Sequence, residues 1–248
     1  YPIEIEKGLF DKIGTRLRRS FHVRKIAVIT DQNLNHFYGE RFLNSLKQAA
    51  FEPFKIVVPP GEKSKNFNML INIYKRLLKA GITRSDLIIT LGGGVVGDSG
   101  GFAAATYLRG IPYIQVPTTL LAQIDSSIGG KVAVDLDMGK NLVGSFYHPE
   151  AVYIDPDLLK TLDRRFLHDG VAEVIKYGCI RDKELFDNLS ILKNDDELLD
   201  HMDYIITTCC NIKKTIVERD EKDLGERMIL NFGHTLGHAI EKYFNYQK

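Results

Sequence analysis

Four polar residues near the end of the sequence recur at the spacing of one helix face. The positions i, i+4, i+7 and i+11 hold Arg227, Asn231, His234 and His238. A continuous helix would carry all four on one side. Two histidines one turn apart are a common pair of metal ligands. Exposed faces usually hold Lys and Glu instead, so this stripe indicates a functional site.

A carboxylate is the usual further ligand of such a pair, and Glu173 is the best candidate. It lies in a predicted helix over residues 170–179, with Lys176 three residues further on and therefore on the same face. The apolar neighbours Val174 and Ile175 predict that this segment is buried. From spacing alone, a metal held by both histidines and Glu173 is therefore one interpretation.

Glycines gather in segment 91–98 (LGGGVVGD), directly after a predicted strand and before a helical pattern. Glycine lets backbone amides approach a ligand closely, and the N-terminus of the following helix favours a pyrophosphate. The glycines are followed by Asp98 rather than by the usual small residue. A strand-to-helix turn without a ligand is therefore the alternative.

Polar residues also follow the other predicted strands. In a parallel sheet these strand ends share the carboxyl edge, where open α/β folds bind ligands. Hydroxyl, carboxylate and amide groups suit a ribose and a pyrophosphate, so a dinucleotide is favoured over a bare phosphate. The polar segments are 30–33, 60–63 and 117–119.

The elements that must position these residues differ between the two halves of the chain. The first half alternates β-rich runs with helical patterns, which predicts a parallel sheet covered by helices on both faces. After residue 157 only helical patterns remain, including 195–218 and 228–244. We therefore predict an α/β domain over 1–155 and an all-helical domain over 156–248. The predicted strands are 25–30, 54–58, 86–91 and 112–116, and the predicted helices of the first half run toward Ala49 and over 67–80.

Composition excludes several classes of protein. The 248 residues are 44% hydrophobic and 26% charged, which is ordinary for a globular chain. A net charge of +1 offers no global attraction for nucleic acid or an anionic membrane, and no apolar stretch is long enough to span a bilayer. The three cysteines form no CxxC pair, which favours reduced thiols and a cytoplasmic location.

The segment 115–141 is dense in polar chemistry. It contains an Asp-Ser-Ser run that begins at Asp125 and a Gly-Gly-Lys turn that ends at Lys131. Such a turn lets a lysine and backbone amides converge on an anion. Lysines are usually solvated, so spacing alone assigns no role to Lys131, to Lys140 or to Arg109.

Five motifs, taken in order, resemble the 3-dehydroquinate synthase family over essentially the whole chain. The resemblance implies a Rossmann-like NAD domain followed by a helical metal-binding domain, with the active site between them. The motifs are 92–98 (GGGVVGD), 116–131 (VPTTLLAQIDSSIGGK), 139–144 (GKNLVG), 172–178 (AEVIKYG) and 230–241 (LNFGHTLGHAIE).

The resemblance implies the reaction as well. Members of this family convert 3-deoxy-D-arabino-heptulosonate 7-phosphate, a small sugar-phosphate acid, into 3-dehydroquinate and phosphate in the shikimate pathway. NAD oxidises one secondary alcohol, phosphate is eliminated, the alcohol carbon is reduced again, and the ring opens and closes by an aldol step. The implied cofactors are NAD and a divalent metal, with zinc expected and cobalt an alternative. The implied assembly is a cytoplasmic homodimer.

The resemblance assigns roles around the metal and the substrate carboxylate. Glu173 and His234 would be metal ligands, whereas His238 would contact the substrate instead of the metal. Lys213 and Arg227 would clamp the substrate carboxylate, a role that suits their charge and geometry.

Further residues match the family's remaining positions. Asp125 and Lys176 would hold substrate hydroxyls, and the expected catalytic residues are these two together with Lys131 and His238. The phosphate side would be formed by Lys131, Asn141 and Asn231, with Arg109 supplied by a partner subunit. The NAD positions are Asp31, Asn33, Glu62, Lys65, Gly93, Gly94, Val95, Asp98, Thr118, Thr119, Lys140 and Thr161.

The chain also departs from the family pattern. The family's third metal ligand lies in a His-Gly-Glu motif beyond Lys248, and the chain starts at Tyr1, so we expect a truncated chain with weak metal binding. Val132 and Asp135 replace the more usual Thr and Asn.

Three other functions are compatible with parts of the sequence. Another sugar-phosphate cyclase, such as 2-deoxy-scyllo-inosose synthase, would have less use for Lys213 and Arg227, because its substrate lacks a carboxylate. A metal-dependent polyol dehydrogenase would produce net NADH. A non-catalytic remnant is expected only if the natural chain ends at Lys248.

Overall fold

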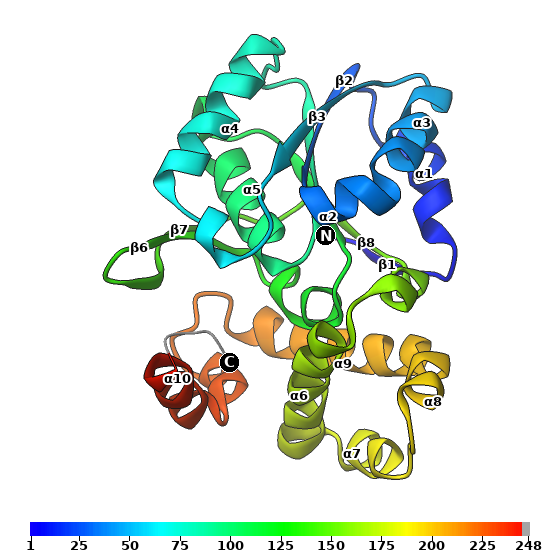
Figure 1. Cartoon of the computed structure of the whole chain (residues 1–248), viewed down its shortest axis with the longest axis vertical. Helices are drawn as coiled ribbons and strands as arrows, with labels where there is room; N and C mark the ends of the chain where they lie inside the picture. Colours follow the sequence, from blue (N-terminus) through cyan, green and yellow to red (C-terminus); the bar gives the residue numbers. More distant parts are fainter. Residues whose placement is uncertain (245–248) are drawn as a thin grey trace.

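Six parallel strands form the sheet of the first half, in the order β1-β8-β5-β4-β2-β3 (Figure 1). The structure, a computed structural model, describes residues 1–244, apart from the side chains of His238, Glu241 and Lys242. The four predicted strands are confirmed, whereas sequence patterns missed β1 and β8, which are only three and four residues long. The strands are β1 (Ile3–Ile5), β2 (Lys25–Asp31), β3 (Glu52–Val58), β4 (Leu87–Gly92), β5 (Tyr113–Pro117) and β8 (Ala151–Ile154).

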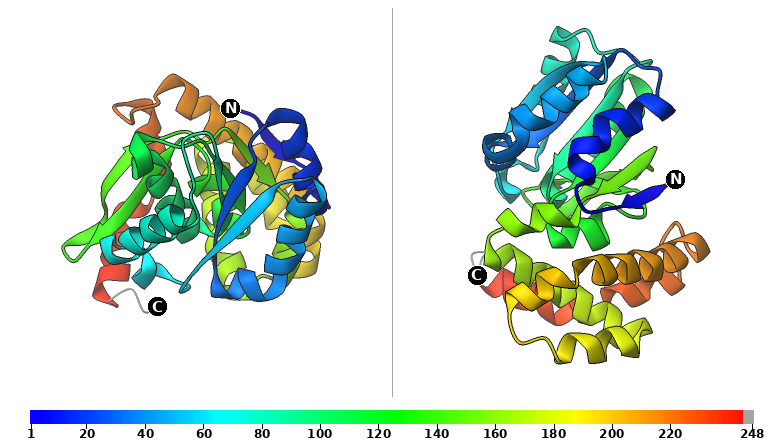
Figure 2. Two further views of the ribbon diagram at one scale, coloured as in Figure 1. Left: turned by 90° about the horizontal axis from the view of Figure 1, so that it is seen from above. Right: turned by 90° about the vertical axis from the view of Figure 1, so that its right-hand side faces the viewer.

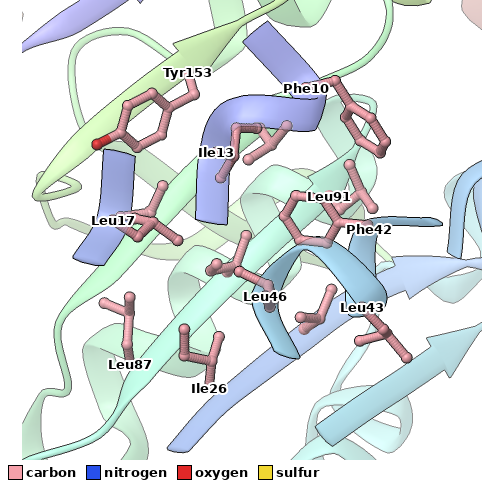
Figure 3. Packing of buried hydrophobic residues seen from close by; sticks show 14 of the residues in the cluster. Phe10, Ile13, Leu17, Ile26, Phe42, Leu43, Leu46, Leu87, Leu91 and Tyr153 are labelled. Carbon is pink, nitrogen blue, oxygen red and sulfur yellow. The ribbon is translucent and has the colours of Figure 1, made fainter. Parts of the chain in front are cut away.

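Helices cover both faces of the sheet, as the continuous apolar strands predicted. Successive residues of β2 point to opposite faces, so Ile26 packs with α1 (Ile13–Ser20) and α3 (Glu40–Gln48), which Figure 3 shows. Its neighbour Ala27 packs with α4 (Phe67–Lys79) and α5 (Gly94–Thr106). The predicted helix 67–80 is thereby confirmed.

Short helical turns connect these elements. Most lie at the ends of strands or helices, and two of them are π-turns. They are η1 (Leu9–Lys12), α2 (Gln32–Leu34), η2 (Asn35–Gly39), η3 (Glu62–Ser64), η4 (Tyr107–Arg109), η5 (Ala122–Ser126) and η6 (Pro156–Thr161).

A β-hairpin projects beside the sheet, and the sequence patterns did not predict it (Figure 1). Its antiparallel strands are β6 (Lys131–Leu136) and β7 (Gly139–Phe146). Val132 and Val134 are buried in the same core as α4 and α5, which holds the hairpin base against the α/β half. The free end therefore extends from an anchored base.

The helical half packs beneath the carboxyl edge of the sheet (Figure 2). Its core joins Val152 and Ile154 of β8 to buried residues of the long helices, including Tyr177 and Cys209. Strand patterns are absent from the described residues after 157, as predicted. The helices are α6 (Arg164–Arg181), α7 (Lys183–Ser190), α8 (Asp195–Asp200), α9 (Met202–Arg219), η7 (Glu226–Asn231) and α10 (His234–Tyr243).

Two predicted helices are interrupted in the structure. The segment 195–218 forms α8 and α9, which are separated at His201. The predicted helix 228–244 is also wrong, because η7 ends at Asn231 and Gly233 takes a left-handed φ of 82° before α10 begins.

Because the predicted helix 228–244 is divided, the prediction that the four polar residues form one stripe on a continuous helix is also wrong. Arg227 and Asn231 lie on a separate 3₁₀ turn and do not share one helix face with His234. The Arg227 guanidinium donates to backbone carbonyls of two other segments, which fixes this turn independently of α10. His238 lies on α10, but its side chain falls outside the described part.

No helix among the described residues is long and apolar enough to cross a membrane. The three cysteines are unpaired, as predicted. Cys209 and Cys210 are buried small side chains, whereas Cys179 is exposed.

Candidate active site

The glycine turn lies at the carboxyl edge of the sheet, where the neighbouring strands end in register. Gly92 is paired with Pro117, and the Thr118 amide donates to the Gly92 carbonyl at 3.0 Å. Gly93 caps α5, so the amides at the start of that helix face this edge. The Thr118 hydroxyl is buried there without a hydrogen-bond partner among the described residues.

Several glycines of this segment are required by close packing. A Cβ at Gly93 would lie 3.0 Å from Thr119 Cγ2, and one at Gly94 would lie 3.2 Å from Ser126 Oγ. Further along α5, a Cβ at Gly100 would approach a side-chain carbon of β4 to 2.4 Å. The run therefore serves packing as well as any ligand, and Gly93, Gly94, Val95 and Asp98 are its partly exposed positions.

A buried lysine gathers the next group of predicted NAD residues. Lys65 is 4% exposed and donates to Asp98 Oδ2 at 2.6 Å and to Asn141 Oδ1. Burial acts to lower the pKa of Lys65, but the Asp98 carboxylate, together with Glu62 and Asp135, raises that pKa above its usual value. Glu62 lies 3.9 Å from the same ammonium. The hairpin thus meets η3 and α5 at one charged cluster.

The hairpin conformation places Asn141 in this cluster. Asn141 takes a left-handed φ of 57°, and its amide donates to Asp135 Oδ1 at 2.7 Å. Lys140 is exposed on the same strand, and its charge acts on Glu62. Asp135, one of the departures from the family pattern, therefore supports the turn that presents Asn141.

The remaining predicted NAD residues lie near the end of β2. The Asp31 carboxylate accepts hydrogen bonds from the amides of Asn33 at 2.8 Å and Leu34 at 2.9 Å, so it caps α2. The Tyr38 hydroxyl lies 2.7 Å from the Thr161 hydroxyl, which links η2 to η6.

The structure brings the two predicted metal ligands together. His234 Nε2 lies 3.2 Å from Glu173 Oε1, although the residues are 61 positions apart. Lys176 contacts the other carboxylate oxygen of Glu173 and is only 6% exposed. The Lys176 side chain is thus buried and the Glu173 side chain is 17% exposed, so this is not a solvent-exposed surface pair. The prediction that the whole segment is buried is wrong, because Val174 is buried but Ala172 and Ile175 are exposed.

This pair fits two positions of a metal site. Imidazole nitrogen and carboxylate oxygen are both zinc donors, and here they approach each other from α10 and α6. Among the side chains that the structure describes, which do not include those of His238 and Glu241, no group of three His, Cys, Asp or Glu is arranged around one point. Glu173 and His234 therefore supply a partial donor set.

A second ion pair joins Lys213 of α9 to Asp125 of η5, and Tyr177 of α6 also contacts it. Lys213 Nζ donates to Asp125 Oδ1 at 2.8 Å and to the Asp125 carbonyl at 2.6 Å. Tyr177 of α6 donates to the same Oδ1 at 2.8 Å. Burial alone would raise the pKa of Asp125, but Lys213 and Lys176 hold it below its usual range. Burial also lowers the pKa of Lys213.

Arg227 holds the Gly-Gly-Lys turn against the helical half. Its guanidinium donates to the Gly129 carbonyl at 3.2 Å and to the Glu221 carbonyl at 2.7 Å. Gly129 has a φ of 96°, and a Cβ there would lie 2.4 Å from the guanidinium, so only glycine permits this contact. Lys131, which follows the turn, forms an ion pair with Asp223.

Two predicted residues stand apart from these clusters. Asn231 is exposed at the end of η7. Arg109 is exposed in η4, at the end of α5 opposite the glycine turn.

A cavity of about 880 Å³ lies behind the Gly-Gly-Lys turn rather than at the charged clusters. Tyr1, His148 and Cys210 contribute to its wall. The Tyr1 hydroxyl accepts a hydrogen bond from the Gly129 amide at 2.8 Å, so the wall of this cavity also supports the turn.

Sequence reasoning missed three supporting residues. Tyr177 was noted only as part of a motif, and Asp135 only as a departure. Asp220 accepts hydrogen bonds from the amides of Leu224, Gly225 and Arg227 and so shapes the loop before η7. An Asp ahead of a glycine-containing loop is a usable signal for such a turn.

The fold is that of solved sugar-phosphate cyclases. A solved 2-deoxy-scyllo-inosose synthase in complex with carbaglucose-6-phosphate, NAD+ and Co2+ matches with a TM-score of 0.85 and 27% identity, over 97% of this chain and 67% of that one. A 2-epi-5-epi-valiolone synthase from Streptomyces hygroscopicus subsp. jinggangensis 5008, with NAD+ and Zn2+ bound, matches with a TM-score of 0.79 and 25% identity, over 94% and 66% of the two chains.

Sequence comparisons identify the family within that class. Models of the 3-dehydroquinate synthase N-terminal and C-terminal regions match residues 55–169 and 170–248. A 3-dehydroquinate synthase from Clostridium acetobutylicum (strain ATCC 824) is 64% identical over 248 residues, which is 100% of this chain and 70% of the relative. The chain therefore belongs to the 3-dehydroquinate synthase family, a family of lyases in the shikimate pathway, and the predicted resemblance is confirmed.

Proposed function

We propose that this chain converts 3-deoxy-D-arabino-heptulosonate 7-phosphate into 3-dehydroquinate and phosphate, in the cytoplasm, at a site between the two halves. The observation that carries the proposal is the group of charges formed by the buried Lys176 and Lys213 and the partly buried Asp125. These charges lie beside the NAD edge, because Asp125 is followed by Ser126, whose Oγ would lie 3.2 Å from a Cβ at Gly94 of the glycine turn. Groups of both charges, close to the edge of the sheet that is proposed to bind NAD, suit a substrate that carries hydroxyl, carboxylate and phosphate groups.

The carboxyl edge would hold NAD. The amides that open α5 at Gly94 and Val95 suit its pyrophosphate, and the unpartnered hydroxyl of Thr118 offers a further hydrogen bond. Asp31 and Lys65 stand at neighbouring strand ends for the ribose groups.

Glu173 and His234 would hold the divalent metal, with zinc proposed. Bound NAD supplies hydride exchange, and the bound metal polarises the alcohol that is oxidised. Lys176 contacts the Glu173 carboxylate, so it stands close enough to the metal position to hold a substrate hydroxyl there.

The other charged residues would orient the substrate. Lys213 has one ammonium proton beyond its two contacts with Asp125, and this proton is available to a substrate carboxylate. Arg227 would act from the same side, and Lys131 would meet the phosphate after leaving Asp223. The departing phosphate can itself accept a proton, so the main demand on these residues is orientation.

The rival cyclase reaction differs in its substrate. A substrate without a carboxylate gains less from two buried cations, and both Lys213 and Arg227 are almost fully buried. Sequence identity also supports the proposal. The chain is 64% identical to the 3-dehydroquinate synthase relative and 27% identical to the solved 2-deoxy-scyllo-inosose synthase.

Arg109 would act in the site of a second copy. α5 has 13 residues and so carries the chain about 20 Å from the glycine turn before η4 begins. Arg109 also takes a left-handed φ of 69°, as does its neighbour Leu108 at 52°. Such strained residues are frequent at ligand contacts. A homodimer would explain an arginine held in this conformation far from its own site.

An apolar face beside η4 supports the same proposal. Ile71 and Leu78 of α4 are 46% and 61% exposed, and Tyr74, on the same face, stacks on Tyr107 of η4. Leu78→Glu should therefore convert a dimer into a monomer and reduce activity, as measured by sedimentation and turnover. A dimer of unchanged stability would contradict this location.

The reaction itself is tested by product analysis. Protein supplied with NAD, zinc and the heptulosonate 7-phosphate should yield 3-dehydroquinate and phosphate in equal amounts. Glycerol should yield no NADH. Glycerol oxidation without phosphate chemistry would instead indicate a polyol dehydrogenase, and turnover of glucose 6-phosphate in place of the heptulosonate would indicate the rival cyclase.

A further inference from the structure

Tyr177 is a fully buried phenol that the proposed chemistry does not use. It lies on α6, is 0% exposed, and packs in the core of the helical half. Its hydroxyl is within hydrogen-bond distance of Asp125 Oδ1, at 2.8 Å, and of the Ile124 carbonyl, at 3.2 Å. Both acceptors belong to η5, the π-turn that carries Asp125 toward the site.

The hydroxyl is the donor here, and its single proton is directed to Asp125 Oδ1, the nearer acceptor, with the Ile124 carbonyl as a weaker second acceptor of the same proton. A carbonyl oxygen accepts only, and an ionised carboxylate also accepts only. Burial, and then the nearby Asp125 charge, raise the pKa of Tyr177 well above its usual value. The phenol therefore keeps its proton and remains a donor.

The two donors to the Asp125 side chain both reach one oxygen. Tyr177 and Lys213 donate to Oδ1, and within the described residues no hydrogen bond reaches Oδ2. The Asp125 side chain is 28% exposed, whereas Lys213 is 7% exposed and Tyr177 is fully buried. The carboxylate is thus held from the core side through Oδ1, while Oδ2 is the oxygen left for a ligand.

We propose that Tyr177 is a positioning residue, which fixes the Asp125 carboxylate so that Oδ2 is presented to a hydroxyl group of the substrate. This inference rests on the proposed role of Asp125 in holding the substrate. Lys213 alone would hold Oδ1 from a single direction. Its flexible four-carbon side chain would still permit the carboxylate to rotate. The phenol adds a rigid second donor and so defines the plane of the carboxylate.

The test compares two isosteric variants, Tyr177→Phe and Tyr113→Phe. Tyr113 is the matched control, because it is also 0% exposed and its hydroxyl donates a hydrogen bond to the Tyr147 carbonyl at 3.0 Å, at the end of β5 opposite the carboxyl edge. Both variants should lose a similar amount of thermal stability. Only Tyr177→Phe should weaken binding of the heptulosonate 7-phosphate to the NAD-free protein, by about tenfold. NAD affinity should stay within about twofold in both.

A double-mutant cycle separates positioning from general support of the fold. In an Asp125→Ala protein, adding Tyr177→Phe should change substrate affinity by less than about twofold, because the group through which Tyr177 acts is already absent. An equal loss of substrate affinity in the wild-type and Asp125→Ala backgrounds would overturn the inference. Unchanged substrate affinity in Tyr177→Phe, measured beside an active wild type, would also overturn it. If the wild type binds the substrate but releases no phosphate, the proposed reaction is rejected. The double-mutant cycle can still be interpreted in that case, because it measures substrate affinity. A wild type that does not bind the substrate would overturn both.

Discussion

The two halves of the molecule prepare their parts of the site in different ways. At the glycine turn of the sheet edge, the groups proposed to face NAD are backbone amides, placed by strand register and by glycines that a larger residue could replace only by displacing its neighbours. In the helical half the corresponding groups are charged side chains, such as Asp125 and Lys213, which hold one another. One region is organised by the backbone and the other by paired charges.

This difference predicts that substitutions in the two regions affect different properties of the protein. A buried ion pair that loses one partner leaves an uncompensated charge, which costs several kcal/mol. In a glycine turn, the effect of a substitution depends instead on the space available for the new Cβ. The effect should therefore stay local and increase with the severity of the clash. Substitutions in the helical half should therefore impair substrate affinity and stability together, whereas substitutions in the turn should act mainly on NAD.

The largest effect is expected for Lys213→Met. It leaves the Asp125 carboxylate without its cation, so substrate affinity should fall at least about 100-fold and the free energy of unfolding by about 3 kcal/mol. Calorimetry and thermal unfolding measure both quantities. Lys214→Met is the control, because that side chain is 57% exposed and should change either quantity little. Equal effects of the two variants would remove the distinction between the regions.

Gly94→Ala should give an intermediate effect confined to the sheet edge. The new Cβ would lie 3.2 Å from Ser126 Oγ and crowd the start of α5, so NAD affinity should fall about tenfold. Substrate affinity of the NAD-free protein should not change. Gly237→Ala, where a Cβ meets no atom within 4 Å, is the matched control for helix propensity. Loss of substrate affinity in Gly94→Ala would show that the turn also shapes the charged cluster.

A smaller effect in the opposite direction is expected for Asp223→Asn. Lys131 is paired with Asp223, so a substrate phosphate must compete with that carboxylate. Asn tolerates the left-handed φ of 60° at this position, so the loop should keep its shape. Substrate KM should therefore fall about twofold to threefold at low salt, and less at high salt. An increase in KM would instead assign Asp223 a direct role in binding.

The smallest effect concerns acid stability. Because the pKa of Asp125 is lowered in the folded protein, its ionised form stabilises the fold above the unfolded value of about 3.9, and this contribution is lost as the pH falls toward the folded pKa. The difference in Tm between wild type and Asp125→Asn should therefore shrink between pH 6 and pH 3. A constant difference over that range would mean that the Asp125 charge is not what stabilises this region.

Sequence patterns predicted the backbone-organised half better than the charge-organised half. The strands around β2 and β4, the helix 67–80 and the glycine turn follow from local periodicity, which the sheet preserves. The contact between Glu173 and His234 spans 61 residues, and no local pattern contains it. Residue chemistry had suggested Glu173 as a further ligand of the two histidines, and the resemblance then assigned Glu173 and His234 to the metal without His238.

The main errors also have local causes. The stripe on segment 228–244 assumed a continuous helix, but Gly233 adopts a left-handed conformation and divides it. The hairpin was missed because its strands, Lys131–Leu136 and Gly139–Phe146, carry the polar residues that were assigned to a ligand-binding loop. Tertiary contacts of Val132 decide their conformation.

The central claim is that these two differently organised regions form one active site. A titration of NAD against phosphate release, run on wild type, Gly94→Ala and Lys213→Met, tests it most directly. Wild type should release no phosphate without NAD, Gly94→Ala should raise the half-saturating NAD concentration with little change in the plateau, and Lys213→Met should lower the plateau at an unchanged half-saturating concentration. Phosphate release without NAD, or both variants shifting the same parameter, would contradict the account.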